Sequence, residues 1–140
     1  MEVLLRNVEL LKKVSCFICN DIEAGRLFHT ETAGKDPEDM QRLVRRGVKE
    51  LELPSMVITL GEKGCVFCDA RKGAPEDGWE PAIATDVIDP SGAGDAFFSG
   101  TTLALTRGLP MRKAVKAGTQ AAHRVLRSTE STGPAAKAVE

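Results

Sequence analysis

A strand, a glycine-rich turn and a helix follow one another over residues 82–105, and this succession constrains the fold more than any other part of the sequence. Residues 82–88 alternate like a strand entering a sheet, and residues 96–105 are typical of a buried helix. Between them lies the turn Asp89-Pro90-Ser91-Gly92-Ala93-Gly94-Asp95. The first N–H groups of a helix lack partners within the helix, and the helix dipole adds partial positive charge there. The sequence therefore predicts an anion site at this turn.

Asp95 is the unusual member of the turn, because a carboxylate repels a bound phosphate. Its useful role would be to accept the proton of a hydroxyl that attacks the terminal phosphorus of a nucleotide. The alternative is that Asp95 only caps the helix, where aspartate is favoured. Gly92 and Gly94 have no Cβ, so a phosphate could approach the backbone closely.

Residues 89–97 closely resemble the C-terminal signature of the ribokinase-like (PfkB) carbohydrate kinases, Asp-x-x-Gly-Ala-Gly-Asp-x-Phe. In that family the Gly-Ala-Gly amides form an anion hole for the transferred phosphoryl group. The resemblance thus gives this role to Gly92, Ala93 and Gly94, and it makes Asp95 the catalytic base.

The same resemblance implies a site for a monovalent cation. Asp89 and the carbonyl of Ser91 correspond to ligands on one side, and residues 128–134 occupy the place of the family's Gly-Ala loop on the other. Ser128 stands where the family has glycine, so the requirement for K⁺ stays open.

Asn20-Asp21-Ile22-Glu23 follows the apolar run Ser15–Cys19, which is typical of a buried strand of a parallel sheet. This tetrad resembles the family's Asn-x-x-Glu, and the resemblance implies that Asn20 and Glu23 hold the hydrated Mg²⁺ of the nucleotide. The alternative is a turn with an N-capping Asn and a first-turn Glu.

Met56–Leu60 is a second predicted buried strand, and Gly61-Glu62-Lys63-Gly64 ends it. Residues 59–64 resemble the family's Thr-x-Gly-x-x-Gly, which implies that Thr59, Gly61 and Gly64 meet the nucleotide. Without the resemblance, this segment is a hairpin turn into residues 65–68, and both interpretations can hold together.

The four cysteines form two C-x-x-C pairs, Cys16/Cys19 and Cys65/Cys68, which raises a structural zinc protein as an alternative. Both pairs lie in strand-like sequence, where side chains three apart point to opposite faces. We expect buried, reduced cysteines.

Outside these motifs, we expect helices over residues 8–14, 36–52 and 111–127, a surface hairpin connection over residues 69–81, and a tail over residues 135–140. The fold class implied is α/β, a mostly parallel sheet with flanking helices that corresponds to the C-terminal half of a ribokinase-like domain, residues 1–134.

The function implied is ATP-dependent transfer of the γ-phosphoryl group to a hydroxyl of a sugar, with ATP and Mg²⁺ as cofactors. A nucleoside kinase of the same family, for instance for pseudouridine, and a non-catalytic nucleotide-binding fragment are the alternatives.

Composition excludes several other classes. The net charge is -1, so no global field favours nucleic acid or an anionic membrane. No apolar run reaches the roughly 18 residues of a membrane span, and the N-terminus has no signal-peptide pattern, so we expect a cytoplasmic protein.

Family kinases are about twice as long as these 140 residues. We therefore expect that the chain is poorly active alone. We also expect that it either forms a homodimer or associates with a missing N-terminal half.

Overall fold

The computed structural model describes residues 16–84 and 92–132, except for the side chains of residues 127–132. The chain divides into two compact units, Met1–Pro81 and Ala82–Glu140, and each is described by itself. No helix within the described ranges is long and apolar enough to cross a membrane.

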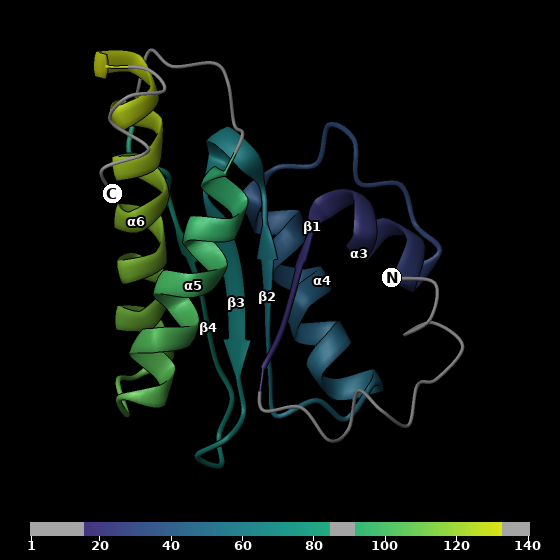
Figure 1. Cartoon of the computed structure of the whole chain (residues 1–140). Coiled ribbons are helices and arrows are strands. Elements are labelled where there is room, and N and C mark those ends of the chain that lie inside the picture. The colour runs from purple at the N-terminus through teal and green to yellow at the C-terminus, as the bar shows by residue number, and fades with distance from the viewer. Residues whose placement is uncertain (1–15, 85–91, 133–140) are drawn as a thin grey trace. The chain divides into compact units, whose positions relative to one another are not determined.

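The first unit contains a four-stranded sheet in the order β1-β2-β3-β4 (Figure 1). Its strands are β1 (Phe17–Asn20), β2 (Ser55–Thr59), β3 (Cys65–Asp69) and β4 (Glu76–Glu80). β1 runs parallel to β2, whereas β2 with β3 and β3 with β4 are antiparallel. The α/β class is confirmed, but the described sheet is mixed where a mostly parallel one was expected. The reason is that short turns join β2, β3 and β4, and short turns connect only antiparallel neighbours.

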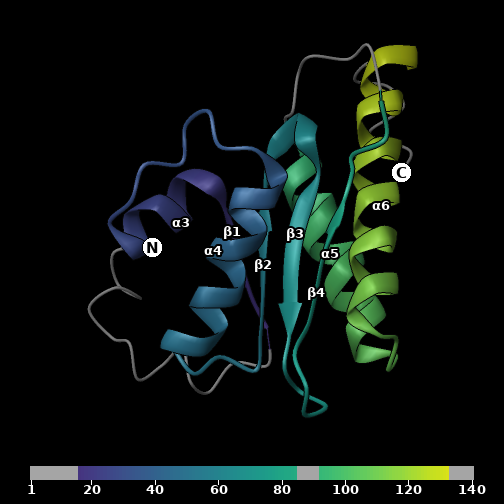
Figure 2. The ribbon, with the colours of Figure 1, turned by 180° about the vertical axis from the view of Figure 1, so that it is seen from behind.

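Helices α3 (Asp21–Phe28) and α4 (Pro37–Glu50) form the crossover between the parallel strands β1 and β2. The start of α4 is fixed locally, because Asp36 Oδ1 accepts a hydrogen bond from Asp39 N at 2.9 Å and Pro37 occupies the first turn. Figure 2 shows these helices beside the strands from behind.

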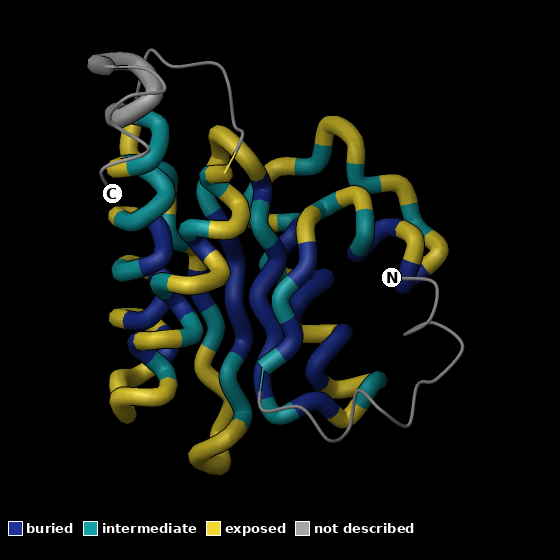
Figure 3. Tube along the Cα trace, in the orientation of Figure 1, coloured by how far each residue is buried: buried dark blue, intermediate teal, exposed yellow. Residues whose placement is uncertain are grey.

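The core of this unit lies between the two helices and one face of the sheet. Buried residues follow the strands and the inner side of α4 (Figure 3). Its fully buried members include Met40 and Val44 of α4 together with Met56 and Ile58 of β2. Because alternate residues of a strand point to one face, Val66 and Cys68 of β3 join the same cluster while Phe67 does not.

The second unit is a helical hairpin of α5 (Ala93–Thr106) and α6 (Met111–Thr132), which lie side by side in both views. Two glycines set their separation. A Cβ on Gly100 would lie 3.1 Å from the Cα of Gly118, and a Cβ on Gly118 would lie 2.8 Å from the carbonyl oxygen of Phe97. The helices therefore approach more closely than two alanines would allow.

Several predicted elements differ or fall outside the description. The expected connection over residues 69–81 contains the strand β4. Of the expected strand over residues 82–88, residues 82–84 are irregular and the rest lies outside the described residues, as do residues 8–14, Asp89, Ser91 and the tail. The helix α6 continues to Thr132, through part of the expected loop at residues 128–134.

Candidate functional site

The N-terminus of α5 presents backbone N–H groups that have no hydrogen-bond partner among the described residues. Gly92 is its N-cap, with φ at 81°, and the first helical bond joins Ala96 N to Gly92 O at 3.0 Å. The N–H groups of Ala93, Gly94 and Asp95 precede that bond, and no side chain in the described part of the chain caps them. This end also carries the positive end of the helix dipole, so it is suited to hold an anion.

Gly94 leaves space at this end of the helix. A Cβ built on Gly94 would meet nothing within 4 Å, so no neighbour among the described residues requires a glycine there. Glycine inside a helix costs about 1 kcal/mol relative to alanine. A ligand that approaches the backbone closely would account for this residue.

Asp95 is exposed in the first turn of α5, and within the described part of the chain its carboxylate forms no hydrogen bond or ion pair. The capping alternative placed Asp95 at the helix cap, but Gly92 occupies the N-cap and no side-chain capping bond is formed. The carboxylate therefore lies in the same helical turn as three amides that have no partner within residues 16–84 and 92–132.

Asn20 and Glu23 form a capping box at the start of α3. Asn20 Oδ1 accepts from Glu23 N at 2.8 Å, and Glu23 Oε1 accepts from Asn20 N at 3.0 Å. The alternative interpretation of this pair, an N-capping Asn with a first-turn Glu, is thus the geometry observed. The box does not engage Glu23 Oε2, and the neighbouring Asp21 Oδ1 accepts from Ile22 N at 3.0 Å.

These residues suit a hydrated Mg²⁺. The ion prefers oxygen ligands and keeps several waters, so one or two carboxylates suffice when phosphates supply the rest. Among the residues described, no three His, Cys, Asp or Glu side chains gather into a metal site, so a cation here would depend on water and phosphate oxygens.

The turn after β2 is a hairpin, as predicted. Leu60 N donates to Gly64 O at 2.7 Å, and the 3₁₀ turn η1 (Gly61–Lys63) lies between. Gly61 has φ at 64° and Gly64 at 96°, which few other residues adopt. Thr59, at the end of β2, is half-buried, and its Oγ1 donates to Cys19 O at 3.4 Å.

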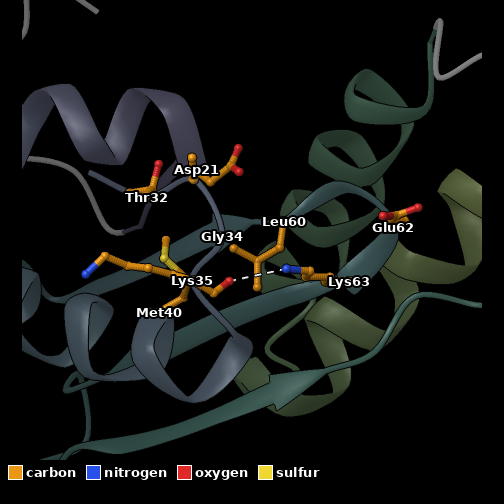
Figure 4. A pocket seen from close by; sticks show the side chains of 9 residues that line it. Asp21, Thr32, Gly34, Lys35, Met40, Leu60, Glu62 and Lys63 are labelled. Carbon is orange, nitrogen blue, oxygen red and sulfur yellow. Dashed lines mark hydrogen bonds between the residues drawn. The ribbon is translucent and has the colours of Figure 1, made fainter. Parts of the chain in front are cut away.

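A pocket of about 200 Å³ lies beside this turn, at the carboxyl ends of β1 and β2 (Figure 4). Parallel strands of open α/β sheets bind ligands at that end. The pocket is lined by Asp21, Thr32, Ala33, Gly34, Lys35, Met40, Leu60, Glu62 and Lys63. Residues 32–35 belong to no sequence motif, because their proximity to the turn arises in the tertiary fold and leaves no local signal.

The cysteines are free. Burial, with a smaller contribution from nearby carboxylates, raises the pKa of Cys19 and Cys65 to about 12 and that of Cys68 to about 11. Among the residues that the structure describes, no three His, Cys, Asp or Glu side chains gather where they could hold a metal ion, so the cysteines do not form a zinc site there.

A sheet whose parallel strands β1 and β2 are joined by helices defines an α/β protein. The sequence matches the profile described as pfkB family carbohydrate kinase over residues 5–138. The chain therefore belongs to the PfkB carbohydrate kinase family.

Two curated relatives have names of nucleoside kinases. The chain is 32% identical over 131 residues to a guanosine-inosine kinase of Exiguobacterium acetylicum, covering 94% of this chain and 42% of the relative. It is 30% identical over 119 residues to a cytidine kinase of Thermococcus kodakarensis, covering 85% of this chain and 39% of the relative. The chain thus spans about two fifths of their length.

Solved structures confirm the ribokinase-like fold. Phosphofructokinase-2 from Escherichia coli, in complex with substrates and products, has a TM-score of 0.72 at 20% identity, over 86% of this chain and 37% of that one. Ribokinase from Arabidopsis thaliana, complexed with ribose and ATP, has a TM-score of 0.68 at 26% identity, over 82% of this chain and 35% of that one.

Proposed function

We propose that this chain carries the nucleotide-binding and catalytic part of a kinase that transfers the γ-phosphoryl group of ATP to a hydroxyl of a sugar. The observation that supports this most strongly is the start of α5, where three amides and the exposed carboxylate of Asp95 share one helical turn and have no partner among the described residues. An anion site alone would bind phosphate, whereas an anion site with a base suits phosphoryl transfer.

In this proposal Asp95 accepts the proton of the acceptor hydroxyl as the oxygen attacks the terminal phosphorus. The amides that follow Gly92 donate hydrogen bonds to the phosphoryl oxygens and stabilise the charge that develops there. Because these donors are backbone groups at a fixed helix end, they need little reorganisation during the reaction.

The nucleotide side is assigned to the ends of β1 and β2. Thr59, Gly61 and Gly64 would meet the nucleotide, while Asn20 and Glu23 would hold the hydrated Mg²⁺. Bound Mg²⁺ supplies neutralising charge to the nucleotide phosphates. We also propose that Asp89 and Ser91 bind a K⁺ ion.

A nucleoside is the second candidate acceptor, because two relatives are named guanosine-inosine kinase and cytidine kinase. The chain spans 42% and 39% of those proteins. We propose that contacts to the acceptor come mostly from the remainder of the kinase fold, supplied by association with that part or in a homodimer, and that the protein works in the cytoplasm.

The test is to incubate this chain with ATP, Mg²⁺, K⁺ and a panel of sugars and nucleosides, and to detect phosphorylated product. We expect Mg·ATP binding and slow, acceptor-dependent transfer. Asp95→Asn should slow transfer by roughly 10²–10⁴-fold, as loss of a positioned general base does, while ATP affinity stays within a few-fold. Equal transfer by the variant would remove Asp95 from the mechanism, and absence of ATP binding would refute the function.

A further inference from the structure

Trp79 makes a hydrogen bond that its position on the sheet does not require. It lies on the edge strand β4, opposite Val66 of β3, and its side chain is 43% exposed. Its indole Nε1 donates to the carbonyl oxygen of Lys63 at 2.7 Å. Lys63 is the last residue of η1, so the bond joins β4 to the turn that follows β2.

The turn itself is exposed. None of the residues of η1 is buried, and neither Gly61, its first residue, nor Gly64, which follows it, has a side chain to pack. Its internal bonds join Lys63 N to Leu60 O at 3.3 Å and Gly64 N to Gly61 O at 3.1 Å. These bonds, with that of Leu60 N to Gly64 O at 2.7 Å, close the turn between β2 and β3, and the Trp79 bond joins it to the next strand of the sheet, β4.

Lys63 extends the same connection toward the pocket. Its Nζ donates to Lys35 O at 3.3 Å, across the side of the pocket drawn in Figure 4. Backbone and side chain of Lys63 therefore link three segments: β4, the turn, and the loop that ends at α4.

The N–H group distinguishes Trp79 from other large apolar residues that could stand at this position of β4. The other side chains of β4 are the acidic groups of Glu76, Asp77 and Glu80. The Trp79 ring is the one large apolar group on this strand, and a Phe would supply similar apolar surface. The feature that Phe lacks is the N–H group that reaches Lys63.

We propose that Trp79 is a positioning residue for the Gly61–Gly64 turn, holding the turn in the geometry that receives the nucleotide without touching the nucleotide itself. This inference rests on the proposed function, because it assigns Trp79 to the same nucleotide site. Loss of the indole donor lets the turn sample other arrangements, so that part of the binding energy for ATP is spent on ordering it.

Trp79 is the single Trp of the chain, so a tryptophan analogue incorporated during biosynthesis changes this side chain alone. Biosynthetic replacement by the benzothiophene analogue of tryptophan exchanges the N–H for sulfur and keeps the ring. Replacement by 5-fluorotryptophan keeps the N–H and serves as the matched control. Three quantities are measured on the full chain: the dissociation constant for Mg·ATP, amide hydrogen exchange at residues 60–64, and the urea midpoint of unfolding.

For the benzothiophene protein we expect roughly 3–10-fold weaker Mg·ATP binding, the loss associated with one hydrogen bond, and faster exchange at residues 60–64. The urea midpoint should stay close to that of the fluorinated control, because the bond positions an exposed turn and not the core. A purely structural role of the bond would lower the midpoint instead. If the unmodified chain binds Mg·ATP and the two analogue proteins bind it with equal affinity, the inference about Trp79 is overturned while the proposed function stands. If the unmodified chain bound no Mg·ATP, the proposed function would fail and the inference with it, whatever the exchange rates.

Discussion

Gly94 and Asp95 are adjacent in the first turn of α5, and Gly94 is unfavourable for a helix that has no ligand. Gly94 adds chain entropy and fills no space, since a Cβ there would meet nothing within 4 Å. Asp95 carries an exposed carboxylate with no partner in the described part of the chain. Residues that weaken an element without a packing reason are typical of functional sites.

Gly94→Ala should therefore separate stability from function. We expect the free energy of unfolding to rise by about 0.5–1 kcal/mol, because alanine favours the helix. Mg·ATP should bind roughly 10-fold more weakly or worse, because the new methyl group obstructs the approach to the amides. Urea unfolding and an ATP titration measure the two effects. Ser99→Ala, on the same helix, is the control, and an unchanged ATP affinity in Gly94→Ala would count against the anion site.

Glu23→Gln tests the metal role without disturbing the helix cap. Glutamine can still accept from Asn20 N, so the capping box should persist and stability should change by less than about 1 kcal/mol. The lost charge should raise the Mg²⁺ concentration needed for half-maximal rate more than it raises the KM for ATP. Titration of Mg²⁺ at fixed ATP measures this shift. If the titration curves coincided, the Asn20–Glu23 pair would have only its capping role.

Among the elements, the α5–α6 hairpin depends on the close contact at Gly100 and Gly118. Gly118→Ala would place a methyl group 2.8 Å from Phe97 O and against the Thr101 hydroxyl, which is buried without a partner. We expect a loss of about 1–3 kcal/mol from overpacking, despite the higher helix propensity of alanine. Thermal unfolding followed by circular dichroism measures it, with Gly94→Ala as the control of opposite sign. Equal or higher stability of Gly118→Ala would mean that the helices are not in close contact there.

The elements that could be predicted from the sequence are those fixed by local signals. Asp36 and Pro37 mark the start of α4, and Gly61 and Gly64 mark the hairpin turn after β2. Strand β4 could not be predicted, because Glu76–Glu80 has the composition of a loop and becomes a strand by pairing with β3.

The candidate site divides in the same way. The motif residues of α3, α5 and η1 lie in contiguous segments, so their positions on strand ends and helix starts follow from local sequence. The contact of Trp79 with Lys63 spans 16 residues, and the pocket-lining loop at residues 32–35 meets the turn only through the fold. Such pairings leave no periodic signal in one sequence.

At the scale of the whole molecule, the share of the family covered by this chain sets the activity that we expect. The chain spans 42% of the guanosine-inosine kinase and 39% of the cytidine kinase. Holding the acceptor in place supplies about 7–11 kcal/mol of barrier lowering in reactions of this kind. We assign the contacts to the nucleotide to this chain and most contacts to the acceptor to the rest of the kinase fold. We therefore expect that this chain binds ATP but does not turn over efficiently. Robust acceptor-dependent ADP release by these residues alone would contradict this division.

The central claim is that the free amides at the start of α5 bind the phosphates of the nucleotide. The most direct measurement is a titration of the ¹⁵N-labelled chain with Mg·ATP, followed through the amide resonances of Ala93, Gly94 and Asp95, with AMP in a parallel titration. The account predicts saturable shifts of these three resonances with Mg·ATP and much smaller ones with AMP, which lacks the β- and γ-phosphates. Resonances that stay in place with Mg·ATP, or that move equally with AMP, would contradict it.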